Sequence, residues 1–446
     1  MWYLIAFVTL LFVGLLDGHT SSMMALLTIY ILGLWSVNTK KGTAERIQGG
    51  TVFGIVFSVY VISALIASQS FLEGQSFFAS DPAKYIEKYS NIKTWSWDDA
   101  LSVLELQYFY FDDNNGLYNE GLTLWAYRAN YYFDGTTVFY MTLLQTMFGV
   151  LASLEIFKIF VFYFNPHKAA KYACTFAILS LFHIYSTIII RDIVIAYFYM
   201  LGLRKIISGP RLSDAVVLLL VLIVTTGIRL YTGLFFGAFV MLWAYMLVQD
   251  TKYANLKIIF VPLIVLGIVF VGASFGSSML MESTEGQLGY YDDFYSEESG
   301  VASKLRALPV GLRQVVILFF SQLPLDNFHK FSISNSFSNY YLSILAIIYK
   351  FFGFVIFYGL MYYSFIMKLF KKMEIRDKWI WIIMLVFIAL NLSTHMDARR
   401  SMEAIPFIFL YYTFFSEKVP HVERKKINNS LLFIGALIML VYTFVS

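Results

Sequence analysis

Charged residues interrupt the apolar segments of this chain at a few positions, and these are the positions at which chemistry could take place. Arg191 and Asp192 follow one apolar run, and Arg229 follows another. A charge at the depth of a membrane costs several kcal/mol unless it is paired or hydrated, so such residues usually mark a functional site. Guanidinium groups can bind an anion, and a carboxylate beside them can accept a proton.

A second group of charges occupies the short turn that contains His395, Arg399 and Arg400. Guanidinium suits phosphate because its planar fork donates two parallel hydrogen bonds and keeps its proton. We therefore expect four arginines to bind one anion: Arg191, Arg229, Arg399 and Arg400. The alternative is that each arginine extends to lipid headgroups or pairs with a nearby acid, namely Asp192 or Glu403.

Asp81 has two interpretations. The order Ser80, Asp81, Pro82 is typical of a helix start, so Asp81 could simply cap a short helix. The functional interpretation is a carboxylate at the membrane surface that accepts the proton of a hydroxyl group. In that interpretation Asp81 is the first candidate for the catalytic base, and Asp192 and His395 are the next choices.

Motifs for other chemistry are absent from the sequence. The histidines lack zinc spacing, and there is no nucleophile elbow, Walker A motif or Rossmann glycine pattern. ATP-driven transport and ordinary hydrolysis therefore have no support. We expect no metal or other cofactor, although adjacent acids could hold a divalent cation at Asp98-Asp99, Asp112-Asp113 and Asp292-Asp293.

The composition is that of a membrane protein. Of the 446 residues 59% are hydrophobic and only 14% are charged, whereas soluble domains are about 25% charged. The single cysteine excludes an intramolecular disulfide, and the N-terminus lacks the basic region of a signal peptide and is expected to be the first helix. The sequence predicts an all-α, polytopic transmembrane bundle of about 11–14 spans. The expected spans lie near 2–16, 21–36, 51–68, 136–163, 171–190, 193–207, 213–228, 230–248, 257–277, 338–369, 379–394, 402–416 and 429–445.

Lysine and arginine gather in six short connections that alternate onto one side of these spans, which is then the cytoplasmic side. The basic connections are 37–50, 164–171, 204–211, 250–257, 368–378 and 417–426. The same alternation places Arg191, Asp192 and Arg229 at the outer ends of their helices. The turn with Arg399 and Arg400 is also outside, against the charge bias, so something other than orientation is expected to require these arginines.

The chain is expected to form one integral membrane domain over 1–446 with two long external loops that contain short helices. The first loop, 69–134, has ten acidic and four basic residues, and the second, 278–337, has seven acidic and four basic residues. Within the second loop, the apolar stretch 309–325 is bracketed by Pro309 and Pro324 and is predicted to lie in the membrane interface.

The pattern resembles a known family. A long external loop with an Asp-x-x-x-Tyr pattern, here Asp81 to Tyr85, is similar to the bacterial oligosaccharide repeat-unit polymerases of the Wzy and EpsG-like kind. In those proteins a serine and an arginine precede an apolar helix and a second helix with arginine or histidine, places that Arg191 and Arg229 hold here. The late turn with Arg399 and Arg400 is also similar. EpsG-like proteins often carry a histidine after the arginine helix, and here Arg229 is followed by Tyr231.

This resemblance implies a membrane glycosyltransferase of the GT-C type in the bacterial cytoplasmic membrane, with its active site facing outward. It would join oligosaccharide repeat units carried on undecaprenyl diphosphate into O-antigen, capsule or exopolysaccharide. The four arginines would bind the diphosphate, a carboxylate would take the acceptor proton, and Tyr85 and Tyr231 would contact the substrate. The expected partners are the lipid-linked oligosaccharide, membrane lipids, and a chain-length regulator and flippase, without nucleic acid.

Two other classes remain open. One is a GT-C glycosyltransferase that uses a sugar on a polyprenyl monophosphate, although such enzymes often have two adjacent acids where this chain has Asp81 and Pro82. The other is a flippase or ligase of lipid-linked glycan. A flippase usually has charges deep in a central cavity and two similar halves, whereas a ligase shares the chemistry and differs only in the acceptor.

Overall fold

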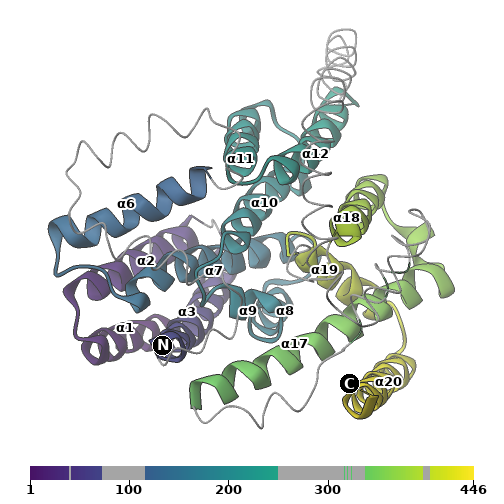
Figure 1. Ribbon diagram of the computed structural model, residues 1–446. Helices are drawn as coiled ribbons and strands as arrows, with labels where there is room; N and C mark the ends of the chain where they lie inside the picture. The colour runs from purple at the N-terminus through teal and green to yellow at the C-terminus, as the bar shows by residue number, and fades with distance from the viewer. Residues whose placement is uncertain are drawn as a thin grey trace.

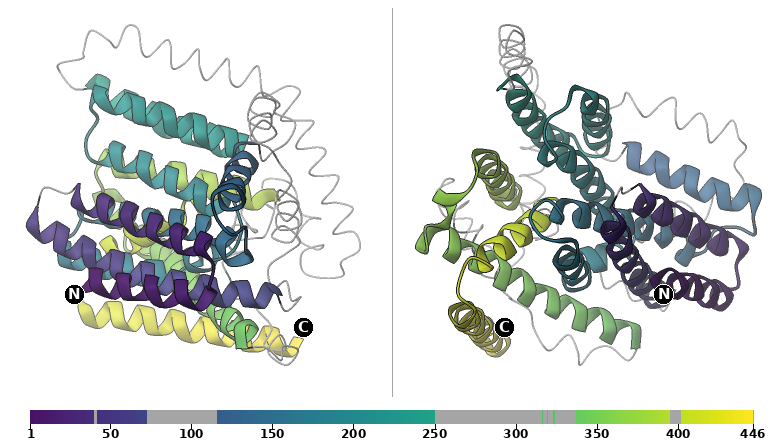
Figure 2. Two further views of the ribbon diagram at one scale, coloured as in Figure 1. Left: turned by 90° about the vertical axis from the view of Figure 1, so that its left-hand side faces the viewer. Right: turned by 180° about the vertical axis from the view of Figure 1, so that it is seen from behind.

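The protein is built from helices. The computed structural model describes residues 1–39, 42–72, 116–249, 337–394 and 402–445, with the single residues 316, 319 and 323. In these ranges every regular element is a helix, which confirms the all-α expectation (Figure 1). The long axes of most of the helices are aligned, with some helices running in opposite directions, as the first view of Figure 2 shows.

The helices differ widely in length. The α-helices are α1 (Trp2–Asp17), α2 (Thr20–Asn38), α3 (Thr43–Leu72), α6 (Gly116–Tyr132), α7 (Val138–Phe160), α8 (Pro166–Leu179), α9 (Leu181–Tyr185), α10 (Asp192–Ile207), α11 (Ala215–Ile228), α12 (Leu230–Gln249), α17 (Phe337–Met361), α18 (Ile375–Thr394), α19 (Ile405–Ser416) and α20 (His421–Val445). A π-helical turn, Tyr362–Ile366, extends α17, and short 3-10 turns lie at Leu212–Asp214 and Leu369–Lys372.

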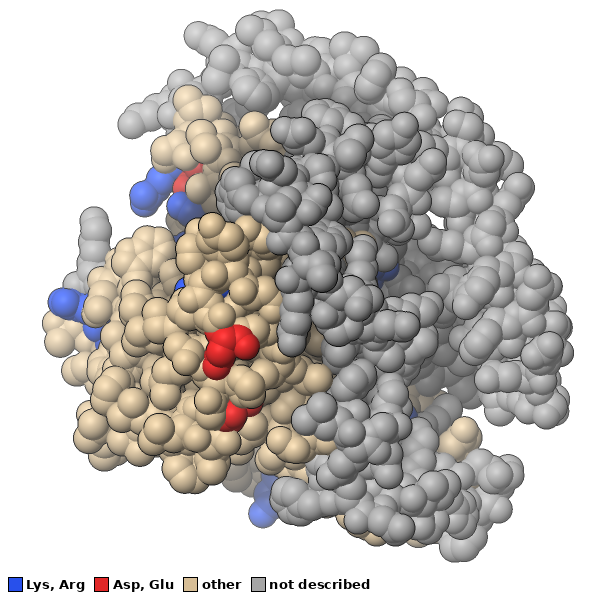
Figure 3. Space-filling view, turned by 60° about the vertical axis from the view of Figure 1, so that its left-hand side comes forward, with Lys and Arg blue, Asp and Glu red and all other residues tan. Residues whose placement is uncertain are grey.

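Several helices could cross a membrane. Within the described part of the chain, five are long and apolar enough: Thr20–Asn38, Thr43–Gln69, Val138–Phe160, Tyr340–Ile366 and His421–Tyr442. Four shorter apolar helices accompany them: Trp2–Asp17, Leu212–Ile228, Thr232–Leu247 and Ile405–Ser416. The face in Figure 3 carries few charges among its described residues, and large apolar side chains such as Leu4, Phe12 and Leu15 are exposed. These helices indicate a membrane protein, and the larger number of spans expected from hydropathy stays a prediction.

Packing contacts fix the directions of the helices that surround the charged residues. A Cβ atom on Gly49 of α3 would lie 3.3 Å from Phe157 of α7, whereas one on Gly149 of α7 would lie 3.1 Å from Tyr60 of α3. The two helices are therefore antiparallel. The α7 helix is parallel to α10, because Phe148 contacts Tyr197 at one level and Glu155 pairs with Arg204 further along both helices. The bundle thus has two ends, which we call the Asp192 end and the Glu155 end.

The basic connections gather at one of these ends. Lys168 in the first turn of α8 pairs with Glu417 after α19 at 3.0 Å, and Arg376 at the start of α18 donates to the carbonyl oxygen of Ile207 at the end of α10. Arg46 lies in the first turns of α3, near the last turns of α7. The described basic residues of the predicted connections therefore lie at the Glu155 end, while 250–257 lies outside the described residues.

One expected span is broken. The sequence predicts a single apolar span over 171–190, but α8 ends at Leu179 because Ser180 adopts extended backbone and its side chain accepts the N–H of Phe182. The short α9 follows, and residues 186–191 are not helical although most of them are buried. At membrane depth such backbone is tolerated only inside protein or beside a water-filled cavity.

The predicted external loops are only partly described. The first loop, 69–134, contains the last residues of α3 and the whole of α6, which is steeply inclined to the common helix direction (Figure 2). Of the second loop, 278–337, and its predicted interfacial stretch, 309–325, little lies within the described residues. The Phe319 carbonyl oxygen accepts a hydrogen bond from Tyr358 at 2.8 Å.

Candidate functional site

A buried ion pair joins two of the residues that the sequence singles out. Nη1 of Arg229 lies 2.9 Å from Oδ1 of Asp192, and the two side chains are 2% and 1% exposed. Asp192 is the first residue of α10, and Arg229 is the extended residue between α11 and α12. The pair therefore lies where two helices begin and one ends. Removing one partner of a pair this deeply buried destabilises the protein, because it leaves the other charge buried and unpaired.

The break at Arg229 is held by hydrogen bonds to its backbone. The N–H of Arg229 donates to Thr225 at 3.0 Å, and the carbonyl oxygen of Arg229 accepts the Thr232 hydroxyl at 2.7 Å. Tyr199 of α10 donates its hydroxyl to the carbonyl oxygen of Thr232. The start of α12 is thus fastened to α10, and this holds the guanidinium of Arg229 opposite Asp192.

Arg191 occupies the N-cap position of α10, where its carbonyl oxygen accepts the N–H of Val194 at 3.0 Å. Its side chain is partly exposed, in contrast to Asp192 and Arg229. The N-terminus of a helix carries a partial positive charge, which stabilises acids and disfavours cations. Asp192 suits this position and Arg191 does not. A cation that the helix disfavours, beside N–H groups that attract anions, is typical of an anion site.

The other predicted site residues lie outside the described side chains. Tyr231 belongs to the first turn of α12, next to Arg229, but its side chain is not described. Asp81, Tyr85, His395, Arg399 and Arg400 lie outside the described residues. Asp192 pairs with Arg229, which lies outside α10, and the expected pairing of Arg191 with Asp192 stays a prediction.

The helix before Arg399 and Arg400, α18, ends at the Asp192 end. Arg376 contacts the end of α10, and Phe387 packs against Tyr199 with ring centroids 6.1 Å apart. The two helices are therefore antiparallel. Thr394 at the end of α18 and Asp192 at the start of α10 each lie seven residues beyond this contact, about 10 Å along the axis.

The segment that contains Asp81 and Tyr85 is also anchored at the Asp192 end on both sides. It follows α3, whose last turn points away from the Glu155 end. It precedes α6, where a Cβ atom on Gly227 would lie 3.3 Å from Leu117. Gly227 is two residues before Arg229, so the chain returns to the bundle next to the ion pair.

A buried histidine cluster lies between α3, α9 and α17, and the sequence does not reveal it. Nε2 of His183 lies 2.7 Å from the hydroxyl of Ser63, which lies 2.6 Å from the hydroxyl of Tyr341. Nδ1 of His183 lies 3.2 Å from the carbonyl oxygen of Ile178, and Tyr60 stacks on the ring. A lone histidine in an apolar run does not indicate a cluster in the sequence, because its partners are distant in the chain.

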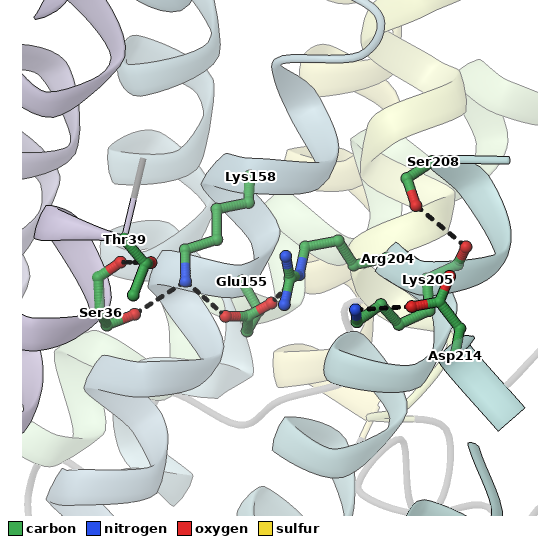
Figure 4. A network of polar contacts seen from close by, with 8 residues as sticks. All are labelled: Ser36, Thr39, Glu155, Lys158, Arg204, Lys205, Ser208 and Asp214. Atoms are coloured by element: carbon green, nitrogen blue, oxygen red, sulfur yellow. Dashed lines mark hydrogen bonds and ion pairs between the residues drawn. The ribbon is translucent and has the colours of Figure 1, made fainter. Parts of the chain in front are cut away.

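A second buried charge network occupies the Glu155 end (Figure 4). Lys158 donates to Glu155 at 2.6 Å and to Ser36 at 2.8 Å, and Glu155 also pairs with Arg204. Lys205 pairs with Asp214 at 2.7 Å. This network ties α2, α7 and α10 together. Arg204 and Lys205 lie in the last turn of α10, where the helix dipole favours cations.

Asp134, between α6 and α7, connects this turn to the start of α2 at the Asp192 end. Its carboxylate accepts the N–H of Thr20 at 2.7 Å and the N–H of Ser21 at 2.9 Å, which caps α2. Partial burial raises the pKa of Asp134, but the hydrogen bonds from Ser21, Thr20 and the backbone of Asp134 itself together outweigh burial and lower it to about 2. His19 lies 3.4 Å from the same carboxylate.

The expectation that this protein needs no metal stays a prediction. Among the described residues no group of three or more metal-binding side chains is present. The acidic pairs at 98–99, 112–113 and 292–293 lie outside the described residues. The described part of the site offers guanidinium groups and helix N–H groups, which suit an anion.

No family model, curated protein or solved structure is significantly similar to this chain. The chemistry at the Asp192 end therefore rests on the residues themselves.

Proposed function

We propose that this protein is a membrane glycosyltransferase that joins lipid-diphosphate-linked oligosaccharide repeat units into a polysaccharide. One observation carries the proposal. Arg191 is partly exposed at the N-terminus of α10, directly beside the buried Asp192–Arg229 pair. The segments that contain Arg399, Arg400 and Asp81 begin at the same end of the bundle. A lipid diphosphate is the anion that this concentration of positive charge would suit.

The described geometry divides the roles among the charged residues. Arg229 is neutralised by Asp192, so its contribution is to hold the broken helices together and to keep α10 in position. Of Arg191 and Arg229, Arg191 is the more exposed and is the one that an anion outside the bundle could reach. With the N–H groups of α10, it would stabilise the negative charge that develops on the leaving diphosphate.

The same geometry bears on the catalytic base. The carboxylate of Asp192 is buried and lies 2.9 Å from the guanidinium of Arg229, so an acceptor hydroxyl has little access to it. Asp192 is therefore a poorer candidate than its position in the sequence suggests. Asp81 and His395 remain the candidates for accepting the proton of the acceptor hydroxyl.

The proposed orientation follows from charge. The described lysines and arginines of the short connections lie at the Glu155 end, so this end would face the cytoplasm. The Asp192 end would then face outward, in the bacterial cytoplasmic membrane. A reaction on that side has no access to ATP, and a substrate that arrives as a lipid diphosphate supplies its own leaving group.

The test is a polysaccharide gel from native cells with and without the gene. The proposal predicts that deletion leaves the lipid core with a single repeat unit and removes the ladder of longer chains. Deletion that gives neither ladder nor capped core, with repeat units accumulating, would instead identify a ligase or flippase. An unchanged ladder would contradict the polymerase and favour a transferase that uses a polyprenyl monophosphate.

A further inference from the structure

A groove runs between α3 and α8 at the Glu155 end, away from the charged site. Its volume is about 480 Å³, within the range of about 300–1,000 Å³ that is usual for small-molecule sites. The two helices are parallel, because both begin at the Glu155 end and Tyr60 of α3 donates a hydrogen bond to Ala177 of α8 at 2.9 Å. Each helix therefore contributes one stripe to the groove.

The polarity of the groove changes along its length. At the start of both helices it is lined by Gln48 of α3 and by His167 and Lys171 of α8. Further along, the lining is mostly apolar, with Ile55 on α3 and Ile178 on α8, and it also includes Thr51 and Thr175. From His167 to Ile178 the groove follows α8 for about 16 Å, roughly half the 30 Å thickness of the hydrocarbon core of a bilayer. The whole groove, polar mouth and mostly apolar channel together, is about as long as one leaflet is thick, which matches an amphiphile.

The charge at the mouth is positive. Lys171 and His167 are exposed and lie four residues apart, so they occupy the same face of α8. The N-terminus of α8, with Pro166 in its first turn, adds the positive end of the helix dipole. Lys168, on the same helix, is absent from the lining and pairs instead with Glu417. The side chains at the mouth thus favour an anionic headgroup.

We propose that this groove binds an anionic phospholipid, with the phosphate at Lys171 and His167 and an acyl chain along Ile55 and Ile178. Basic pockets between membrane helices bind such headgroups elsewhere, and one lysine near the surface of a membrane changes affinity about fivefold. This inference does not depend on the proposed polymerase activity, because the groove lies at the opposite end of the bundle.

The chain supplies its own probe. Cys174 is the single cysteine of the protein, and it lines the middle of the groove. In purified, delipidated full-length protein, the rate of Cys174 alkylation by a small maleimide reports whether the groove is occupied. The experiment titrates phosphatidylglycerol against phosphatidylcholine with identical acyl chains, and includes glycerol phosphate as the headgroup alone.

Phosphatidylglycerol is expected to slow alkylation at concentrations about fivefold lower than phosphatidylcholine, and glycerol phosphate is expected not to slow it. Lys171→Gln should remove the difference between the two lipids, whereas the matched control Lys168→Gln should keep it. Equal protection by both lipids in the unaltered protein would overturn the proposal. The proposal would also fail if both lysine variants lost the difference between the two lipids equally, because that would show general attraction to the surface. Protection by glycerol phosphate alone would overturn it as well.

Discussion

The two ends of α10 carry buried charges of the same kind in different settings. At the Glu155 end, Glu155, Lys158 and Arg204 lie in regular helices, and the cations suit the last turn of α10. At the Asp192 end, the ion pair lies at helix breaks beside the non-helical residues 186–191, and Arg191 opposes the dipole of α10. The first arrangement stabilises the bundle. The second places a partly exposed cation at a helix N-terminus, a position that the helix dipole disfavours.

The largest effect on stability is expected from Arg229→Ala. The substitution leaves Asp192 charged and buried, and breaking a buried pair in this way costs about 3–5 kcal/mol. Thermal unfolding of the detergent-solubilised protein measures the loss.

A double variant sharpens this prediction. Asp192→Asn combined with Arg229→Ala removes both charges and should be clearly more stable than Arg229→Ala alone. If the double variant loses as much as the two single variants together, the pair contributes no coupling and the account of the Asp192 end is wrong.

Glu155→Gln is expected to cost about 3 kcal/mol, because Lys158 and Arg204 lose their carboxylate partner while Arg204 keeps some contact with solvent. Activity per folded molecule should be unchanged. The comparison measures unfolding temperature and polysaccharide yield normalised to protein in the membrane. Reduced yield from normally folded protein would assign a functional role to the Glu155 end as well.

Hydropathy and charge could predict much of this bundle but not its breaks. The long apolar runs of α2, α3 and α7 predict helices, because a helix pairs the backbone groups that would be costly to bury unpaired in lipid. The break between α8 and α9 could not be predicted from apolar content, which does not change at Ser180. The only local signal is the capping preference of serine, and serine is also common inside helices of membrane proteins.

The site was predicted by residue type rather than by geometry. Arg191, Asp192 and Arg229 are conspicuous because charges are rare in apolar runs. The pairing of Asp192 with Arg229 depends on the packing of α10 beside α11, which residue types do not specify. The cluster of His183, Ser63 and Tyr341 could not be found for the same reason, since three separate helices supply it.

A smaller effect is expected from Tyr341→Phe. The change removes one hydroxyl from Ser63, which keeps its contact with His183 at 2.7 Å, so the loss should be about 1 kcal/mol. Thermal unfolding checks the value, and Tyr340→Phe, on an exposed neighbour, is the matched control. Equal effects of the two changes would show that the cluster adds no stability.

A further effect is expected from a change in pH. The pKa of Asp134 is lowered to about 2 from an ordinary value of 3.8, so the folded protein favours the charged carboxylate. The stabilisation is complete above about pH 4 and is lost as the pH falls toward 2. The difference in unfolding temperature between the unaltered protein and Asp134→Asn should shrink over that range. A difference that stays constant would contradict the capping role of the carboxylate.

The most direct test of the account compares Arg191→Gln with Arg211→Gln. Arg191 lies at the Asp192 end, and Arg211 is an exposed arginine after the opposite end of α10. The measurement is the length distribution of polysaccharide in cells that contain equal amounts of each protein in the membrane. The account predicts that Arg191→Gln reduces polymer by about 100-fold or more, as the loss of one transition-state donor does, and that Arg211→Gln leaves it normal. Normal chains from Arg191→Gln would contradict the central claim that the Asp192 end binds the diphosphate.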